Sequence, residues 1–140
     1  MKNRAFAMFS CLTALTAAGA FAQSTAVLRA DIPFEFRVGG TLLPAGQYEV
    51  VPQTGRNLLE IQCFDCKTAG VLVRIQWVEA AARPDKGELI FHRYGNAYFL
   101  SKVWSPGSSQ GREMPASPAE RELASNGPAM VTAIAAMVER

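Results

Sequence analysis

The sequence has a single histidine, three cysteines and only 19% charged residues. It lacks the glycine-rich loops that cradle phosphates. Because His92 is the only imidazole, a histidine-based metal site would lack its other ligands, and every serine would share one potential base. These absences predict a chain with no catalytic centre, no bound metal and no cofactor.

The first 22 residues have the organisation of an export signal. Two basic residues precede the uncharged run 5–20, which is rich in small side chains, and Ala20-Phe21-Ala22 fits the small-x-small cleavage rule. The run is too short and too poor in large apolar side chains to anchor a membrane. We therefore predict a signal peptide over 1–22 and one domain over 23–140, periplasmic or secreted, with no membrane span in the mature chain.

Removing this segment changes the charge balance. It takes away two of 14 basic residues and none of the 12 acidic ones, which leaves the mature chain with no net charge. Nucleic acids and anionic membrane surfaces select basic proteins. We therefore expect neither as a partner, and instead expect an unidentified protein or another component of the cell envelope.

Short runs with apolar residues at every second position dominate the mature chain and predict strands. They span residues 26–38, 47–52, 57–63, 71–78 and 88–104. Pro33 cannot donate a ladder hydrogen bond, so the first run is an edge strand or is broken there. Short turns between the runs favour antiparallel pairs.

The C-terminal third adds one helix. Residues 105–115 are rich in Gly, Ser and Pro and predict a long connection. Ser117-Pro118-Ala119-Glu120 then forms a capping box with proline at the first helical position, which predicts a helix to about Ala124. The tail 129–138 fits a helix or a strand, and we favour a strand returning to the sheet. The fold class is thus mainly β, a small antiparallel sandwich or barrel with one short C-terminal helix.

The clearest hairpin signal is Gly95-Asn96, a two-residue loop between β-rich runs. It predicts these opposite pairs: Tyr94 with Ala97, His92 with Phe99, and Ile90 with Ser101. Both faces of the hairpin are partly apolar, so we expect it to be central and covered on both sides. His92 has the chemistry of a base or metal ligand, but a histidine hydrogen-bonded within the sheet is the favoured interpretation.

Cys63 and Cys66 remain after Cys11 leaves with the signal. Three interpretations of this Cys-x-x-Cys spacing stay open. A redox dithiol normally opens a helix, whereas strands flank this pair, and a zinc site needs two further ligands. The third, a local disulfide at a hairpin tip, is favoured. Its small loop would stabilise the fold by less than the ~3 kcal/mol expected for a 15-residue loop.

Several segments taken together resemble a family of small exported bacterial proteins of unknown function. They span nearly the whole mature chain: Asp31–Gly39, Leu43–Tyr48, Phe91–Gly95, Tyr98–Leu100, Trp104, Gly111–Glu113 and Ser117–Leu123. The resemblance implies a secreted β domain and carries no catalytic residue. The cysteine pair lies outside the shared pattern.

Charged and aromatic residues in these segments form a candidate binding surface: His92, Arg93, Tyr94, Tyr98, Trp104, Arg112 and Glu113. For the charged members, a salt bridge between the long connection and the hairpin is the favoured structural alternative. The expected function is a non-catalytic binding or structural module of the cell envelope. Two alternatives remain open. One is a small-ligand carrier whose apolar barrel pocket is lined by Tyr94, Tyr98 and Trp104, and the other is a thiol-disulfide protein using Cys63 and Cys66.

Overall fold

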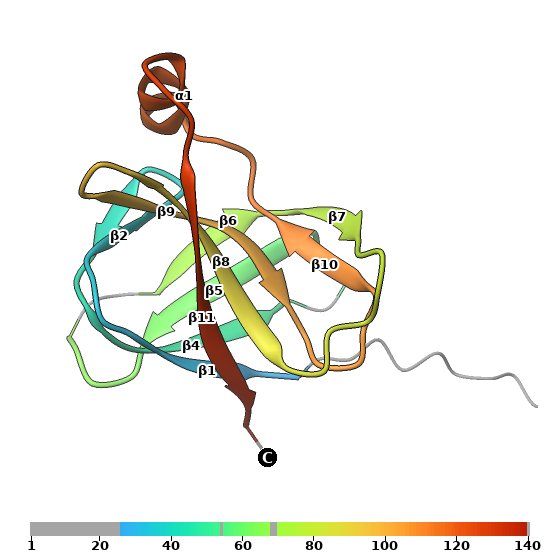
Figure 1. Cartoon of the computed structure of the whole chain (residues 1–140). Coiled ribbons are helices and arrows are strands. Elements are labelled where there is room, and N and C mark those ends of the chain that lie inside the picture. Colours follow the sequence, from blue (N-terminus) through green and yellow to red (C-terminus); the bar gives the residue numbers. More distant parts are fainter. Residues whose placement is uncertain (1–25, 54, 68–69, 140) are drawn as a thin grey trace, which may run out of the picture.

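The computed structural model describes residues 26–53, 55–67 and 70–139 (Figure 1). The predicted signal peptide, including Cys11, lies outside these residues. Within them the chain forms eleven strands and one helix. In chain order these are β1 (Leu28–Ile32), β2 (Phe36–Val38), β3 (Thr41–Leu43), β4 (Gly46–Pro52), β5 (Leu58–Cys63), β6 (Val71–Arg74), β7 (Gln76–Glu79), β8 (Gly87–Tyr94), β9 (Ala97–Trp104), β10 (Gln110–Glu113), α1 (Pro118–Ser125) and β11 (Met130–Val138).

The strands form one nearly closed barrel. The order β3-β2-β9-β8-β11-β1-β4-β5-β6 runs most of the way around it. β7 follows β6 after one residue and pairs with β10, which pairs in turn with β9 and so links the β6 end of the path back to β9. Among the described residues the strands pair antiparallel, except that β2 and β9 pair in parallel at one position. The predicted mainly β fold is therefore confirmed, and of the two architectures named it is the barrel.

Aromatic and aliphatic side chains fill the interior. Phe36, Tyr48 and Phe91 are completely buried. The Phe36 ring meets Tyr48 and Phe91 edge-on, at centroid distances of 5.0 and 5.5 Å, an arrangement that aromatic quadrupoles favour. The Tyr48 hydroxyl donates to the carbonyl of Pro44. Burial, followed by the negative charge of Asp65, raises the pKa of Tyr48.

The C-terminal strand completes the barrel. β11 pairs with β8 over seven positions and with β1 at its far end, and Figure 1 shows it running down the front of the molecule below α1. The prediction of a strand in the tail is confirmed. The predicted run 26–38 is broken at Pro33, as its missing N–H requires, because β1 ends at Ile32 and β2 begins at Phe36.

One predicted register is wrong. Ile90 pairs with Lys102, and a β-bulge places Ser101 as an extra residue in β9. Leu100 and Val103 are both buried in the core although three positions separate them. A regular strand with period two cannot direct both side chains inward, so the bulge reconciles the sequence with the core.

Two further predictions missed how the barrel closes. The expected strand 71–78 is split at Ile75, where the chain leaves β5 and begins to pair with β10. The expected connection 105–115 contains β10, a strand in which Gly111 and Arg112 are buried. β10 lacks the alternating apolar pattern of a strand, and one of its two partners, β7, is distant in sequence.

Candidate functional site

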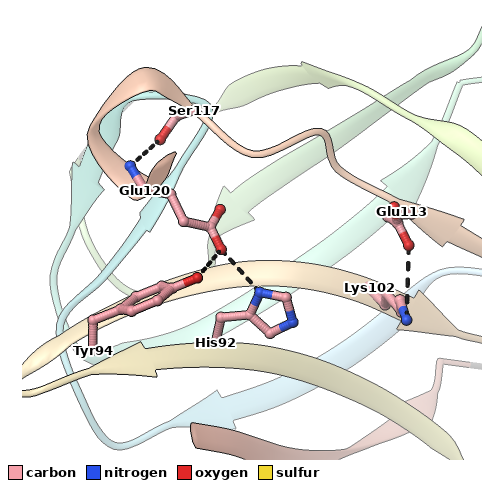
Figure 2. Close-up of polar contacts among 6 residues, drawn as sticks. All are labelled: His92, Tyr94, Lys102, Glu113, Ser117 and Glu120. Atoms are coloured by element: carbon pink, nitrogen blue, oxygen red, sulfur yellow. Dashed lines mark hydrogen bonds and ion pairs between the residues drawn. The ribbon is translucent and has the colours of Figure 1, made fainter. Parts of the chain in front are cut away.

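Helix α1 places one carboxylate against the barrel. Ser117 caps the helix, because its Oγ accepts the backbone N–H of Glu120 at 3.2 Å. In a capping box the glutamate side chain would return to the cap residue. Here Glu120 extends from the helix towards the β8–β9 hairpin (Figure 2). The predicted helix start is confirmed, and the carboxylate serves a different contact.

Glu120 joins two hairpin side chains at one oxygen. Its Oε1 lies 2.9 Å from His92 Nδ1 and accepts the Tyr94 hydroxyl at 3.3 Å. The Glu120 side chain is only 8% exposed and that of His92 is 33% exposed. The prediction that His92 bonds within the sheet is therefore wrong, because the imidazole reaches outward to a helix 28 residues further along the chain.

This geometry orients the imidazole. A carboxylate beside Nδ1 favours the tautomer with its proton on that nitrogen, and Figure 2 shows the other ring nitrogen pointing away from Glu120. Burial, together with the nearby Glu120 carboxylate, raises the pKa of Tyr94, which keeps its hydroxyl protonated as a donor. The cluster thus has one buried acceptor satisfied by two fixed donors.

A hollow of about 230 Å³ lies beside the cluster. Its lining includes His92, Tyr94, Ser101, Lys102, Glu113 and Glu120. Lys102 Nζ and Glu113 Oε2 are 3.7 Å apart on this wall (Figure 2). The hollow therefore offers a ring nitrogen, an ammonium group and carboxylate oxygens, which suit a polar ligand with both donors and acceptors.

Two further hollows share Tyr94. One, of about 300 Å³, is also lined by Leu123, Asn126 and Pro128 from the end of the helix. The other, of about 350 Å³, lies towards β2 and includes Arg37, Asn96 and Tyr98. We call the residues lining these three hollows the Tyr94 surface.

The structure divides the predicted binding residues between different faces of the hairpin. Arg93 and Tyr98 form an opposite pair at the hairpin tip, with the guanidinium 5.5 Å from the tyrosine ring. The Tyr98 ring stacks on Phe34 at 3.8 Å. His92 and Tyr94 instead contact Glu120 on the outer side, where the helix lies.

Trp104 and Arg112 lie towards the other end of β9, whereas Glu113 lines the hollow beside His92 and Tyr94. Trp104 pairs with Gly111, whose missing side chain makes room for the indole; a Cβ there would lie 2.5 Å from the ring. Glu113 pairs with Lys102 and links β10 to the hairpin. Arg112 is buried beside Ser105 and Trp77, away from the His92 cluster.

Cys63 and Cys66 form a disulfide with their Cα atoms 5.5 Å apart, at the end of β5. The pair thus has the proximity that the predicted local disulfide requires. Asp65 brings a third potential ligand atom within 4.8 Å, the one such group among the described residues, but disulfide sulfurs are not the thiolates that metals bind. Phe64, between the two cysteines, donates its N–H to Gln47 on β4 at 2.8 Å, which ties the loop to the barrel.

Sequence reasoning did not identify the Glu120 side chain as part of the candidate site. Its place in the capping box was visible, but that pattern explained it as part of a helix start.

In the part of the chain that the structure describes, no helix is long and apolar enough to span a membrane. Comparisons of the chain with protein-family models, with curated proteins and with solved structures find no match.

Proposed function

We propose that the chain is an exported, non-catalytic binding module of the cell envelope whose partner docks on the Tyr94 surface. The observation that carries this proposal is that three hollows of about 230, 300 and 350 Å³ adjoin at one residue. Three separate hollows that share a lining residue suit an extended partner segment better than one compact small molecule. That segment belongs to a protein or to a surface polymer.

The centre of this surface is preorganised. The Tyr94 hydroxyl is fixed by Glu120, and the carboxylate is fixed in turn by His92. Tyrosine combines a broad apolar ring with a polar tip, and a side chain already held in place loses little conformational freedom on binding. These properties support Tyr94 as the anchor of the interface.

A binding role also fits the surroundings of His92. A carboxylate-oriented imidazole has the arrangement of a general base, and a base needs a nucleophile or an activated water beside it. Ser101 lines the same hollow, but it is buried at the β-bulge. We propose that the His92–Glu120 contact holds α1 against the hairpin. The docked helix then shapes the hollows.

The two alternatives have less support. A carrier with an apolar interior would need a lining other than Tyr94 and Trp104, since Tyr94 contacts the helix outside the barrel and Trp104 packs on Gly111. A redox dithiol normally opens a helix, whose N-terminus lowers the thiol pKa, and residues 64–67 after Cys63 are not helical.

The test is binding of the purified chain to an envelope fraction. Tyr94→Ala should reduce the bound amount at least tenfold, whereas Tyr94→Phe should reduce it about twofold, because the ring supplies most of the contact area. Leu72→Ala is the matched control, since Leu72 is 60% exposed on β6 and outside all three hollows. Equal binding by wild type and Tyr94→Ala would overturn the proposal. Protease treatment of the fraction distinguishes a protein partner from a polymer.

A further inference from the structure

A buried guanidinium lies far along β9 from Tyr94. Arg112 in β10 pairs with Val103 of β9 and with Trp77 of β7, and only 8% of it is exposed. Tyr94 pairs with Ala97, six residues before Val103. At about 3.3 Å per strand residue the two positions are separated by about 20 Å. Arg112 itself lines none of the three hollows, although its chain neighbour Glu113 lines one of them.

The charge of Arg112 has few partners. Its Nη1 donates to Ser105 Oγ at a long 3.4 Å, and its guanidinium carbon lies 5.0 Å from the centroid of the Trp77 ring. Among the described residues no carboxylate oxygen comes within 4.0 Å of it, including Glu79 two positions from Trp77 on β7. Burial lowers the pKa of Arg112, yet arginine stays charged in proteins.

Arg29 is a second guanidinium whose partners can be compared with those of Arg112. This side chain is 37% exposed and has two carboxylates, Glu49 Oε1 at 2.7 Å and Glu139 Oε1 at 2.8 Å. The better-solvated arginine thus has counter-ions, whereas the buried one has a hydroxyl group and a ring. Burial of a charge is costly unless a partner compensates it. Among the described residues, Arg112 thus lacks the counter-ions that Arg29 has.

The unused donors of Arg112 are open to such a partner. A guanidinium carries five N–H groups, and Ser105 takes only one contact. Among the described residues, the one fully buried side-chain nitrogen without a hydrogen-bond partner belongs to Arg29, not to Arg112. The unpaired N–H groups of Arg112 are therefore not sealed from solvent.

Trp77 provides the second half of a site. Its indole N–H donates to Asn57 Oδ1 at 3.3 Å, which fixes the ring, and 47% of the residue is exposed. We propose that Arg112, Ser105 and Trp77 bind a ligand carboxylate, with the guanidinium pairing the oxygens and the indole packing on the ligand body. Guanidinium and carboxylate match in a two-bond geometry. This site is independent of the proposed Tyr94 interface.

The melting temperature of the purified chain tests the site. Two carboxylates are each compared with a neutral analogue at constant ionic strength: N-acetylphenylalanine with its amide, and glucuronate with glucose. At concentrations well above its dissociation constant, a carboxylate should raise the melting temperature by about 3 °C or more, and the neutral analogues by less than about 1 °C. A response to the amino acid alone identifies a peptide C-terminus, and a response to glucuronate alone identifies an acidic sugar.

Arg112→Gln should abolish the carboxylate response. Arg74→Gln removes the same charge from an exposed position on β6 and should retain the response. Equal shifts with acids and neutral analogues, no shift with either acid, or an unchanged response in Arg112→Gln would each overturn the proposal. The wild-type comparison of acid with analogue decides the question even if Arg112→Gln does not fold.

Discussion

The two faces of the β8–β9 hairpin have different tasks. On the inner face, Leu89, Phe91 and Val103 are completely buried among apolar side chains. On the outer face, His92 and Tyr94 are partly exposed and meet at the carboxylate of Glu120. Because a strand alternates its side chains, one hairpin can supply the core with one face and leave the other for recognition. Stability should therefore depend mostly on the inner face and partner binding on the outer one.

The largest effect is expected for Phe91→Ala. The ring is completely buried and makes edge-on contacts with Phe34 at 5.0 Å and Phe36 at 5.5 Å. Removing the ring loses the favourable free energy of burying it away from water and leaves a cavity. Together these lower the free energy of unfolding by about 3–5 kcal/mol. Urea denaturation measures this loss. Leu72→Ala, on an exposed position, should change the same quantity by less than about 0.5 kcal/mol.

On the outer face, Glu120→Ala should cost about 1–2 kcal/mol, because Tyr94 and His92 lose a charged acceptor while His92 can still reach water. His92→Ala should cost about 1 kcal/mol and, under the binding-module account, affect stability rather than any turnover. Urea denaturation of both variants and of the double variant gives their coupling. If the losses simply add, the contact does not hold α1 on the hairpin.

Tyr48 of β4 gives the core beneath this inner face a pH-dependent stability. Its pKa is raised in the folded chain, so the folded state keeps the hydroxyl proton at pH values where the unfolded chain releases it. This contribution is fully present below the unfolded pKa of about 10 and is lost as pH rises towards the folded value. Tyr48→Phe should cost about 1 kcal/mol at neutral pH, through the hydrogen bond to Pro44. It should also flatten the decline in unfolding free energy between about pH 9 and 11, and an unchanged slope would contradict the assignment.

The smallest effect is expected for Lys102→Met. Lys102 and Glu113 are 3.7 Å apart with side chains 37% and 29% exposed. Exposed ion pairs contribute little, so the free energy of unfolding should change by about 0.5 kcal/mol or less. Partner binding should weaken more visibly, because the pair lies on the wall of a hollow. A large loss of stability with unchanged binding would contradict the account, because this outer-face pair would then serve stability and not partner binding.

Local sequence patterns predicted much of this barrel. The strand runs, the break at Pro33, the Gly95-Asn96 hairpin and the Ser117 cap each depend on chemistry within a few residues. The bulge at Ser101 and the pairing of β10 were not predictable in the same way. Both are fixed by the requirement that strands distant in sequence close one barrel over one core.

The candidate site shows the same limit. The aromatic and charged residues of the hairpin were visible as candidates, but their division between two faces and two ends of β9 follows from register. The contact of His92 with Glu120 joins residues 28 positions apart. No periodicity encodes a side-chain contact of that kind, because it depends on where the helix docks.

The most direct test of the binding-module account is site-specific photocrosslinking in the envelope fraction. A benzophenone side chain is placed at position 96, where Asn96 lines the hollow of about 350 Å³, and separately at position 72 on β6. The account predicts a discrete crosslinked product from position 96 and none from position 72. Crosslinking only from position 72, or equally from both positions, would contradict the claim that the Tyr94 surface receives the partner.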